Sequence, residues 1–393
     1  MPTAVQFGAG NIGRGFMAQL FYESAFETVF VDVSSELVDE INRLGRYAIH
    51  IVGPYAAEVE ISGIRALHGV DSTAVVEAVA ECNVACVSVG AGALPHIAEN
   101  LAAGLELRFR RAGAPLNILV CENLQYAAEL LLDSVSTHLP GELASQILAN
   151  TGFVQAVVSR MVPLQENPES DRLSVRVEAY KTLPVDAIAI VGGLPPIVGV
   201  KPVQNFAAHI ERKLFTHNCA HAALGYLGYQ RGHEFCYQAL ADPAIGRLLF
   251  EGNPSVLGET GEALIRKHAF DREEHKAHVS DLMERFSNVE LRDTCFRVAR
   301  DPIRKLAPDD RLVGAARLCE SQGIHPVSVS IVIGEALAFD SPDDPSSVEL
   351  QRRIRLEGVE SVLRDVCGIN PDEWLAGRVR VAYGTVGERD SDS

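Results

Sequence analysis

Short apolar runs separated by amphipathic stretches dominate the first half of the chain. Four runs have the length of buried strands in a parallel sheet: residues 4–7, 28–33, 83–89 and 116–121. Apolar positions at helical spacing predict helices over residues 12–24, 35–44 and 72–81. Two alternating segments, 47–53 and 57–67, predict a small β insertion. Strands that alternate with helices of this length indicate a parallel sheet covered by helices.

The pattern changes near residue 200, beyond which almost every apolar spacing is helical. The predicted helical stretches are residues 203–225, 233–241, 245–250, 258–268, 272–286, 290–300, 309–322, 326–339, 346–358 and 359–367. The apolar segment 191–202, interrupted by glycine and proline, predicts the boundary. We therefore expect an α/β domain at residues 1–200 and an all-α domain at residues 201–393.

Composition and charge narrow the class of protein. The 393 residues are 47% hydrophobic and 22% charged, which is typical of a folded globular chain of two or three domains. The formal net charge of −17 excludes a general nucleic-acid binder and argues against docking on anionic membranes, because both need clustered Lys and Arg. The negative net charge does not exclude the binding of a small anion by a few local cationic side chains.

Cysteine spacing and the start of the chain bear on the compartment. The eight cysteines are scattered without a CxxC pair, which is typical of reduced thiols and predicts no metal site. Residues 1–3 lead directly into an apolar strand without a basic segment, and no apolar run reaches the roughly 18 residues of a membrane span. We expect a cytoplasmic protein. The sequence carries no signal for an oligomeric state.

A glycine motif follows the first predicted strand. Residues 8–13 read Gly8-Ala9-Gly10-Asn11-Ile12-Gly13, a GxGxxG at which a helix begins, and the next strand carries Asp32. In this context Gly8 makes a tight turn, Gly10 lets the backbone approach a pyrophosphate, and Gly13 lets the helix pack closely. Asp32 would accept hydrogen bonds from a ribose 2′-hydroxyl and repel a 2′-phosphate. The first domain is thus predicted to be a Rossmann-type dinucleotide-binding domain that prefers NAD to NADP.

Two further strand ends are candidates for the same site. Ligands of open parallel sheets bind at the carboxyl ends of the strands. Gly90 follows the strand at 83–89, and Asn123 follows the strand at 116–121. We expect Gly90 to line the nicotinamide side of the cofactor site.

One helix in the second half carries an unusual polar triplet. Lys213, Asn218 and His221 point at roughly 0°, 140° and 80° around an ideal helix, so they share one broad face. Oxidation of a secondary alcohol needs a base for the hydroxyl proton and donors for the developing oxyanion. A lysine with a lowered pKa can be that base. Spacing alone is also compatible with a solvated lysine beside an Asn–His surface pair.

Five segments of the chain resemble the mannitol-1-phosphate 5-dehydrogenase family of polyol-specific long-chain dehydrogenases. They occur in the family's order and are GAGNIGRGF at 8–16, PLNILVCEN at 115–123, GFVQAVVSR at 152–160, ERKLFTHNCAH at 211–221 and DPIRKLAPDDRL at 301–312. The resemblance implies NAD-dependent, metal-independent interconversion of D-mannitol 1-phosphate and D-fructose 6-phosphate. It implies that Lys213 is the general base, that Asn123 and Asn218 stabilise the alkoxide-like oxygen, and that His221 positions the reacting hydroxyl.

The residues that would bind the substrate follow the family pattern less closely than the residues of the reaction centre. The family has an Asp before the arginine of the third segment, where this chain has Ser159 before Arg160. For a substrate phosphate, Arg304 and Lys305 are candidates that would form a small cationic pocket in the second domain, and a structural clamp near a loop is the alternative for both. Arg14, just after the glycine motif, is a further candidate. Arg300 and Arg311 are expected to be surface charges.

Two alternatives differ in function. One is a dehydrogenase or reductase of an unphosphorylated polyol or a sugar acid, similar to mannitol 2-dehydrogenases or to fructuronate and tagaturonate reductases. The other is an NAD-binding sensor without catalysis, against which the retained triplet argues.

Overall fold

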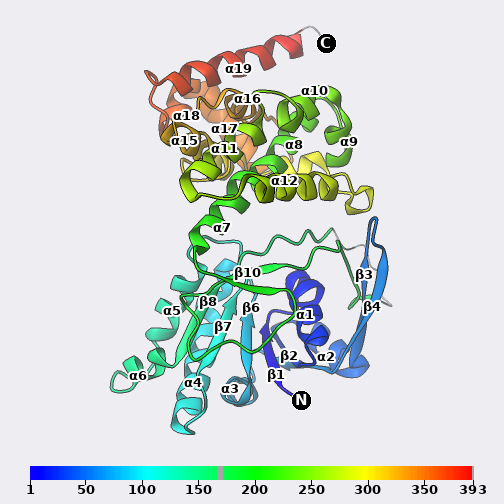
Figure 1. Cartoon of the computed structure of the whole chain (residues 1–393), viewed down its shortest axis with the longest axis vertical. Helices are drawn as coiled ribbons and strands as arrows, with labels where there is room; N and C mark the ends of the chain where they lie inside the picture. The colour runs from blue at the N-terminus through cyan, green and yellow to red at the C-terminus, as the bar shows by residue number, and fades with distance from the viewer. Residues whose placement is uncertain (164, 166–170, 392–393) are drawn as a thin grey trace. The chain divides into compact units, whose positions relative to one another are not determined.

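The computed structural model describes residues 1–163, 165 and 171–391, and it confirms an α/β half followed by a helical half (Figure 1). The chain divides into two compact units, Met1–His209 and Ile210–Ser393, which we call unit 1 and unit 2.

Unit 1 contains a six-stranded parallel sheet in the order β5-β2-β1-β6-β7-β8. Its strands are β1 (Thr3–Phe7), β2 (Glu27–Asp32), β5 (Ile64–His68), β6 (Val84–Val87), β7 (Leu116–Val120) and β8 (Thr151–Gln155). The chain runs outward from β1 through β2 and β5 and then returns to β6. The strand order therefore reverses between β1 and β6, which is where open α/β sheets bind ligands.

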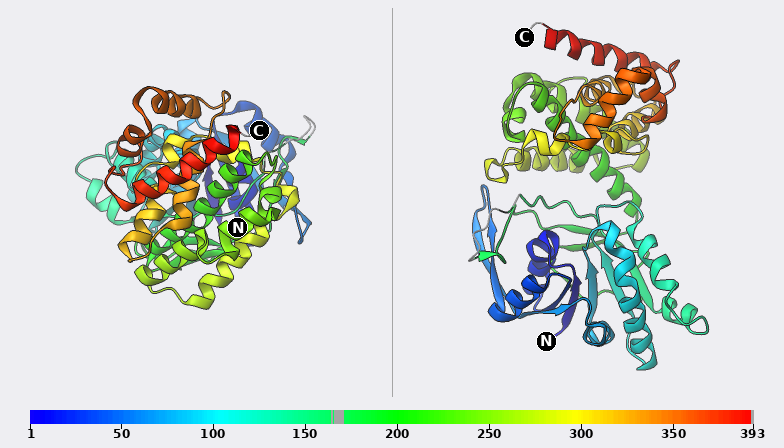
Figure 2. Two further views of the ribbon diagram at one scale, coloured as in Figure 1. Left: turned by 90° about the horizontal axis from the view of Figure 1, so that it is seen from above. Right: turned by 180° about the vertical axis from the view of Figure 1, so that it is seen from behind.

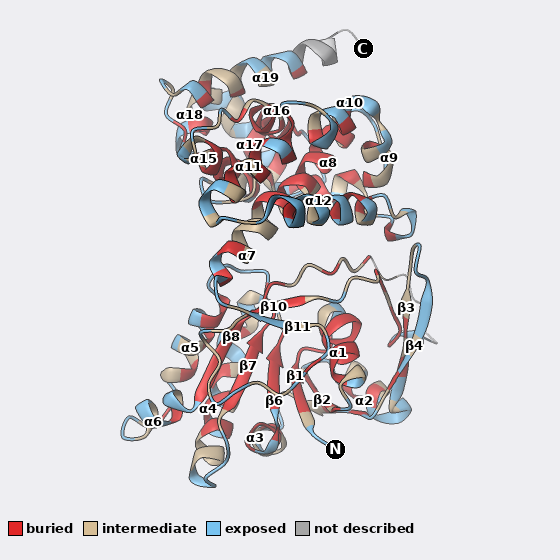
Figure 3. Cartoon of the chain, in the orientation of Figure 1, coloured by how far each residue is buried: buried red, intermediate tan, exposed pale blue. Residues whose placement is uncertain are grey.

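Helices cover both faces of this sheet, whose strands are almost wholly buried (Figure 3). One face packs against α3 (Ser72–Glu81), α4 (Leu94–Arg110) and α5 (Ala127–Ser136). In the view from behind, α4 and α5 lie side by side (Figure 2). The other face packs against the π-helix η1 (Gly13–Met17), α1 (Ala18–Glu23) and α2 (Ser35–Leu44).

The predicted β insertion is correct only in part. β3 (Arg46–Ile51) and β4 (Ala57–Ser62) pair antiparallel, and β9 (Val175–Val177) joins β3. Residues 64–67, predicted to belong to the insertion, instead lie in β5 of the main sheet. Gly63, with φ +66°, turns the chain between β4 and β5, and the continuous alternation conceals this turn. The remaining elements of unit 1 are η2 (Ala91–Ala93), α6 (Ala144–Ala149), β10 (Leu183–Asp186) and β11 (Val200–Val203), with α7 (Phe206–Arg212) leading into unit 2.

Unit 2 is helical throughout its described residues and is centred on α8 (Cys219–Gln230), whose residues 222–228 are all buried. Small residues let neighbours approach α8 closely: a Cβ on Gly225 would lie 2.8 Å from Val298 Cγ1, and one on Gly228 2.5 Å from Cys295 Sγ. The other elements are η4 (Lys213–Asn218), α9 (Cys236–Ala241), α10 (Pro243–Gly246), η5 (Arg247–Glu251), α11 (Val256–His268), α12 (Arg272–Phe286), η6 (Val289–Leu291), α13 (Cys295–Ala299), α14 (Pro302–Lys305), α15 (Val313–Ser321), α16 (Val327–Leu337), α17 (Pro345–Glu357), α18 (Val359–Asp365) and α19 (Trp374–Ser391).

Candidate active site

The glycine motif forms a tight turn between β1 and η1 in unit 1. Gly8 has φ +88°, and a Cβ on it would lie 2.4 Å from Ser88 O. A Cβ on Gly13 would lie 2.0 Å from Gly8 O, so a larger residue cannot fit without moving the backbone. Gly10 is exposed, and a Cβ on it would meet no atom within 4 Å. The turn thus needs Gly8 and Gly13 for its own geometry and leaves Gly10 open to a ligand.

Asp32 ends β2 and faces this turn. Its carboxylate accepts hydrogen bonds from the N–H groups of Ala9, at 2.7 Å, and of Ser34, at 2.9 Å. A carboxylate has about four acceptor sites, so Asp32 can hold the turn and still accept from ribose hydroxyls. Asn11 is exposed at the start of the helical stretch, whereas Ile12 packs partly against the core.

Gly90 and Asn123 follow β6 and β7, two neighbouring strands. Gly90 has φ +88° and open space around it, and Asn123 is exposed. The N–H groups of Val89 and Gly90 donate to Glu122 Oε1 at 2.7 and 2.9 Å. Burial raises the pKa of Glu122, which these two donors oppose. Glu122, absent from the sequence prediction, positions the Gly90 loop; its only signal is a carboxylate directly after an apolar strand.

Two arginines of the sequence motifs have structural contacts in unit 1. Arg14 is buried and donates to the carbonyl oxygens of Ala9 and Leu173, at 2.7 and 2.5 Å. Arg160 is buried and donates to the carbonyl oxygens of Glu178 and Gly15, at 2.8 and 2.9 Å. Both side chains fasten backbone segments together, and neither offers an exposed guanidinium to a phosphate.

Two members of the polar triplet of unit 2, Lys213 and Asn218, lie on a π-helical segment that the sequence did not predict. η4 covers Lys213–Asn218, and α8 continues directly from it with His221 in its first turn. A π-helix turns by roughly 80° per residue rather than about 100°, so Asn218 lies roughly 40° from Lys213 instead of roughly 140°. The π segment thus gathers Lys213, Asn218 and His221 into a narrower sector than an α-helix would.

Lys213 is half-buried among other cationic groups. Burial, and next the nearby Arg311, lower the pKa of Lys213 from 10.5 to about 8. Burial also lowers the pKa of His217 well below its usual value, with Arg285, His221 and Lys213 adding to the effect. Lys213 and His221 therefore lie within electrostatic range of the same buried imidazole. A lysine tuned in this way can release and accept a proton near neutral pH.

The cations near residues 301–312 differ in exposure. Arg304 is half-exposed and pairs with Asp301. Lys305 is buried, and its ammonium donates to the carbonyl oxygens of Val298 and Arg300. Burial, and then Arg311 and Arg304, lower the pKa of Lys305 to about 7.

Arg311 is not a surface charge, which corrects the sequence prediction. Its side chain is 12% exposed, and Nε donates to Asp310 Oδ1 at 2.8 Å. A Cβ on Gly314, close behind it in the chain, would lie 3.0 Å from Phe215 Cε1 of η4, so this segment packs against the helix of Lys213. The effect of Arg311 on both lysine pKa values makes it their common neighbour. Arg300, by contrast, is exposed as expected.

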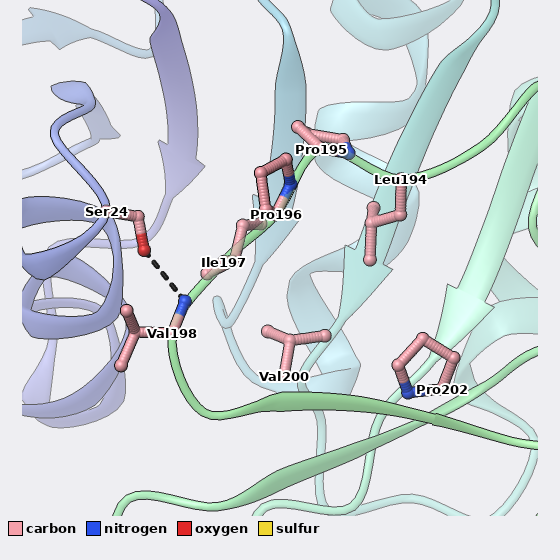
Figure 4. A pocket seen from close by; sticks show the side chains of 8 residues that line it. All are labelled: Ser24, Leu194, Pro195, Pro196, Ile197, Val198, Val200 and Pro202. Atoms are coloured by element: carbon pink, nitrogen blue, oxygen red, sulfur yellow. Dashed lines mark hydrogen bonds between the residues drawn. The ribbon is translucent and has the colours of Figure 1, made fainter.

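Two hollows lie outside these groups. One, of about 430 Å³ in unit 1, is lined by Ser24 and by residues of the segment 194–202, with the N–H of Val198 donating to Ser24 Oγ at 2.8 Å (Figure 4). It has no titratable lining side chain and thus no means of proton transfer. The other, of about 790 Å³ in unit 2, contains Asp242, whose carboxylate is already paired with Arg231 and His233.

The described part of the chain has neither a metal-ligating cluster nor a membrane-spanning helix. Across residues 1–163, 165 and 171–391, no group of three or more His, Cys, Asp or Glu side chains could hold a metal ion. No helix in this described part of the chain has the length and apolar character needed to cross a membrane.

Sequence comparison relates both halves of the chain to one family. Residues 2–199 match the family model described as the mannitol dehydrogenase Rossmann domain, and residues 205–370 match the mannitol dehydrogenase C-terminal domain. The mannitol-1-phosphate 5-dehydrogenase of Brevibacillus brevis is 41% identical over 377 residues, which cover 96% of each chain. The enzyme of the same name from Oceanobacillus iheyensis is 38% identical over 381 residues, covering 96% of this chain and 97% of the relative.

Solved structures of low sequence identity share the fold. Mannitol 2-dehydrogenase of Pseudomonas fluorescens, in a ternary complex with NAD and D-mannitol, has a TM-score of 0.74 at 17% identity, covering 99% of this chain and 92% of that one. A D-sorbitol dehydrogenase in substrate-free form has a TM-score of 0.82 at 16% identity, covering 99% and 93%.

Proposed function

The chain belongs to the mannitol dehydrogenase family, and we propose that it is an NAD-dependent oxidoreductase that interconverts D-mannitol 1-phosphate and D-fructose 6-phosphate. The relatives named mannitol-1-phosphate 5-dehydrogenase, which align along almost the whole chain, support this reaction. The structural observation that carries it is Lys213, whose pKa of about 8 suits a general base, on one helical sector with Asn218 and His221. We propose, as predicted, that residues 1–200 bind the cofactor and that residues 201–393 bind the substrate and transfer the proton.

The residues of unit 1 fit a dinucleotide. A bound nicotinamide would supply the hydride acceptor in its oxidised form and the hydride donor in its reduced form. The open backbone at Gly10, with Asn11 and Ile12 at the start of the helical stretch, would hold the pyrophosphate. Asp32 would hold the ribose hydroxyls, and Gly90 would lie on the nicotinamide side.

The residues of unit 2 supply the proton chemistry. Neutral Lys213 takes the hydroxyl proton as the alcohol is oxidised, and protonated Lys213 returns it in the reverse direction. Asn218 donates a hydrogen bond to the reacting oxygen, which becomes more negative during the reaction. His221 helps to position the reacting group by binding another hydroxyl of the substrate, because the single proton of the reacting hydroxyl goes to Lys213. These proposed steps do not require a metal ion to polarise the oxygen.

We place the substrate phosphate in the predicted cationic pocket. Arg304 offers a half-exposed guanidinium for bidentate binding, in exchange for its pairing with Asp301. Lys305, whose ammonium is held by backbone carbonyls, adds positive charge only in its protonated form, because its pKa is lowered to about 7. Arg311, which influences both Lys213 and Lys305, extends this pocket toward the base.

The proposed setting is the cytoplasm, with a small-molecule substrate and neither nucleic acid nor membrane as a partner. All eight cysteines are free and buried, as suits a reducing compartment. The net charge of −17 gives no basic surface for a polyanion.

The test of this function is Lys213→Ala, assayed by oxidation of NADH with D-fructose 6-phosphate. We expect turnover to be abolished while NADH still binds with its original affinity, because the cofactor residues lie in unit 1. Lys276→Ala, which removes an exposed lysine of α12, is the matched control and should leave turnover unchanged. Activity that survives Lys213→Ala would mean that another group is the base.

A further inference from the structure

His221 is held by a carboxylate that no motif of the sequence indicated. Its Nε2 lies 2.7 Å from Asp293 Oδ2. The imidazole stacks on the ring of Phe286, with 5.2 Å between centroids and 16° between planes, and meets His217 edge-on. An ionised carboxylate can only accept a hydrogen bond, so Nε2 must be the nitrogen that carries the proton.

Asp293 is itself fixed from several sides. Its second oxygen, Oδ1, accepts from Arg297 Nε at 2.7 Å, and its backbone carbonyl accepts from the N–H of Cys236 at 2.8 Å. Burial would raise the pKa of Asp293, but the bond to His221 and the charge of Arg297 outweigh it, and the net shift is downward. The carboxylate therefore stays ionised and in place across the neutral range.

Helix packing explains why these two side chains meet. His221, Gly225 and Gly228 are spaced i, i+4 and i+7, so they share one face of α8. The two glycines bring this face against Val298 and Cys295 of α13. Asp293 lies just before α13, so the close helix contact places its carboxylate opposite His221.

The other ring nitrogen of His221, Nδ1, is the one that can bind a substrate. Among the described residues, no hydrogen bond reaches His221 Nδ1, and the side chain is 20% exposed. With the proton held on Nε2, Nδ1 of the neutral ring is an acceptor.

We propose that Asp293 is a positioning residue that keeps His221 in the Nε2–H tautomer and thereby presents Nδ1 as the acceptor for a substrate hydroxyl. The identity of the substrate as a sugar phosphate rests on the proposed function. The tautomer of His221 is independent of it.

The tautomer can be measured without substrate. Two-bond ¹H–¹⁵N spectra of the full chain, labelled with ¹⁵N in its histidine rings, distinguish a protonated from an unprotonated ring nitrogen, and His221→Gln identifies the signals of His221. We expect Nε2–H in the unmodified protein. In Asp293→Asn the amide can donate to Nε2, so we expect Nδ1–H to become populated. Nδ1–H in the unmodified protein, or the same pattern in both proteins, would overturn the proposal.

Kinetics give a second measurement. Asp293→Asn should lower kcat by roughly tenfold or more, because a misplaced tautomer fails in the reaction itself. KM for the ketose phosphate should change less than kcat, and NADH affinity should not change. Asp372→Asn, which removes an exposed carboxylate, is the control. An equal kcat in Asp293→Asn would refute the positioning role. A protein that reduced a different ketose would refute the proposed function alone, and the tautomer result would stand.

Discussion

Lys213→Met tests the assignment of the base through protein stability. The change keeps the length of the side chain and removes its ammonium group. Because the pKa of Lys213 falls from 10.5 to about 8 on folding, the folded protein binds this proton more weakly than the unfolded chain by about 2.5 pKa units. At about 1.4 kcal/mol per unit, the folded state bears a cost of up to about 3.5 kcal/mol when the lysine is charged.

The sign of the pH dependence follows from this lowered pKa. Between pH 8 and 10.5 the unfolded chain binds more protons than the folded one, so raising the pH stabilises the fold. Below pH 8 the cost is present in full. From pH 7.5 to 9.5, the unmodified protein should therefore gain about 2 kcal/mol of unfolding free energy relative to Lys213→Met, which lacks the titrating group.

Urea unfolding of the two proteins at these two pH values measures the gain. The chain has one tryptophan, Trp374, and it lies in unit 2 with Lys213, so its fluorescence follows the unfolding of the correct unit. Groups other than Lys213 titrate alike in both proteins and cancel in the comparison. A stability difference that stays constant between pH 7.5 and 9.5 would refute the lowered pKa, and with it the argument for Lys213 as the base.

Three further substitutions test other parts of the site. Arg311→Met removes the cation that helps to lower the pKa of Lys213, so the pH profile of polyol oxidation, rising near pH 8, should move upward by about half a unit or more. Asp32→Asn removes the charge that repels a 2′-phosphate, and the ratio of kcat/KM for NAD to that for NADP should fall by about tenfold. Gly13→Ala places a Cβ 2.0 Å from Gly8 O, so NADH affinity and thermal stability should both decrease, as fluorescence titration and calorimetry would report.

The features that the sequence predicted correctly are those with a local signal. Residues 35–44 and 72–81 were predicted as helices with the bounds that the structure gives them, and the caps Ser34 and Asp71 explain why each begins there. The order of an α/β half and a helical half follows equally from the apolar spacing. Strand β5 was misjudged because its place in the sheet depends on pairing with β2, a contact that no local pattern contains.

In the candidate site, too, the residues with a local sequence pattern were predicted, and those placed by tertiary contacts were not. The helix carrying Lys213, Asn218 and His221 could be recognised, but its π-helical geometry depends on packing and has no sequence signal. Asp293 reaches His221 across 72 residues of chain through the contact of α8 with α13. Arg311 was mistaken for a surface charge because its burial likewise comes from tertiary packing.

The most direct test of the account is a comparison of NADH oxidation with D-fructose 6-phosphate, D-fructose and D-fructuronate. A phosphate held by two charge-assisted hydrogen bonds is worth roughly 3 kcal/mol or more, so kcat/KM for the phosphorylated ketose should exceed the other two values by about 100-fold or more. Comparable turnover of fructose or fructuronate would contradict the proposed substrate and favour an enzyme of unphosphorylated polyols or sugar acids.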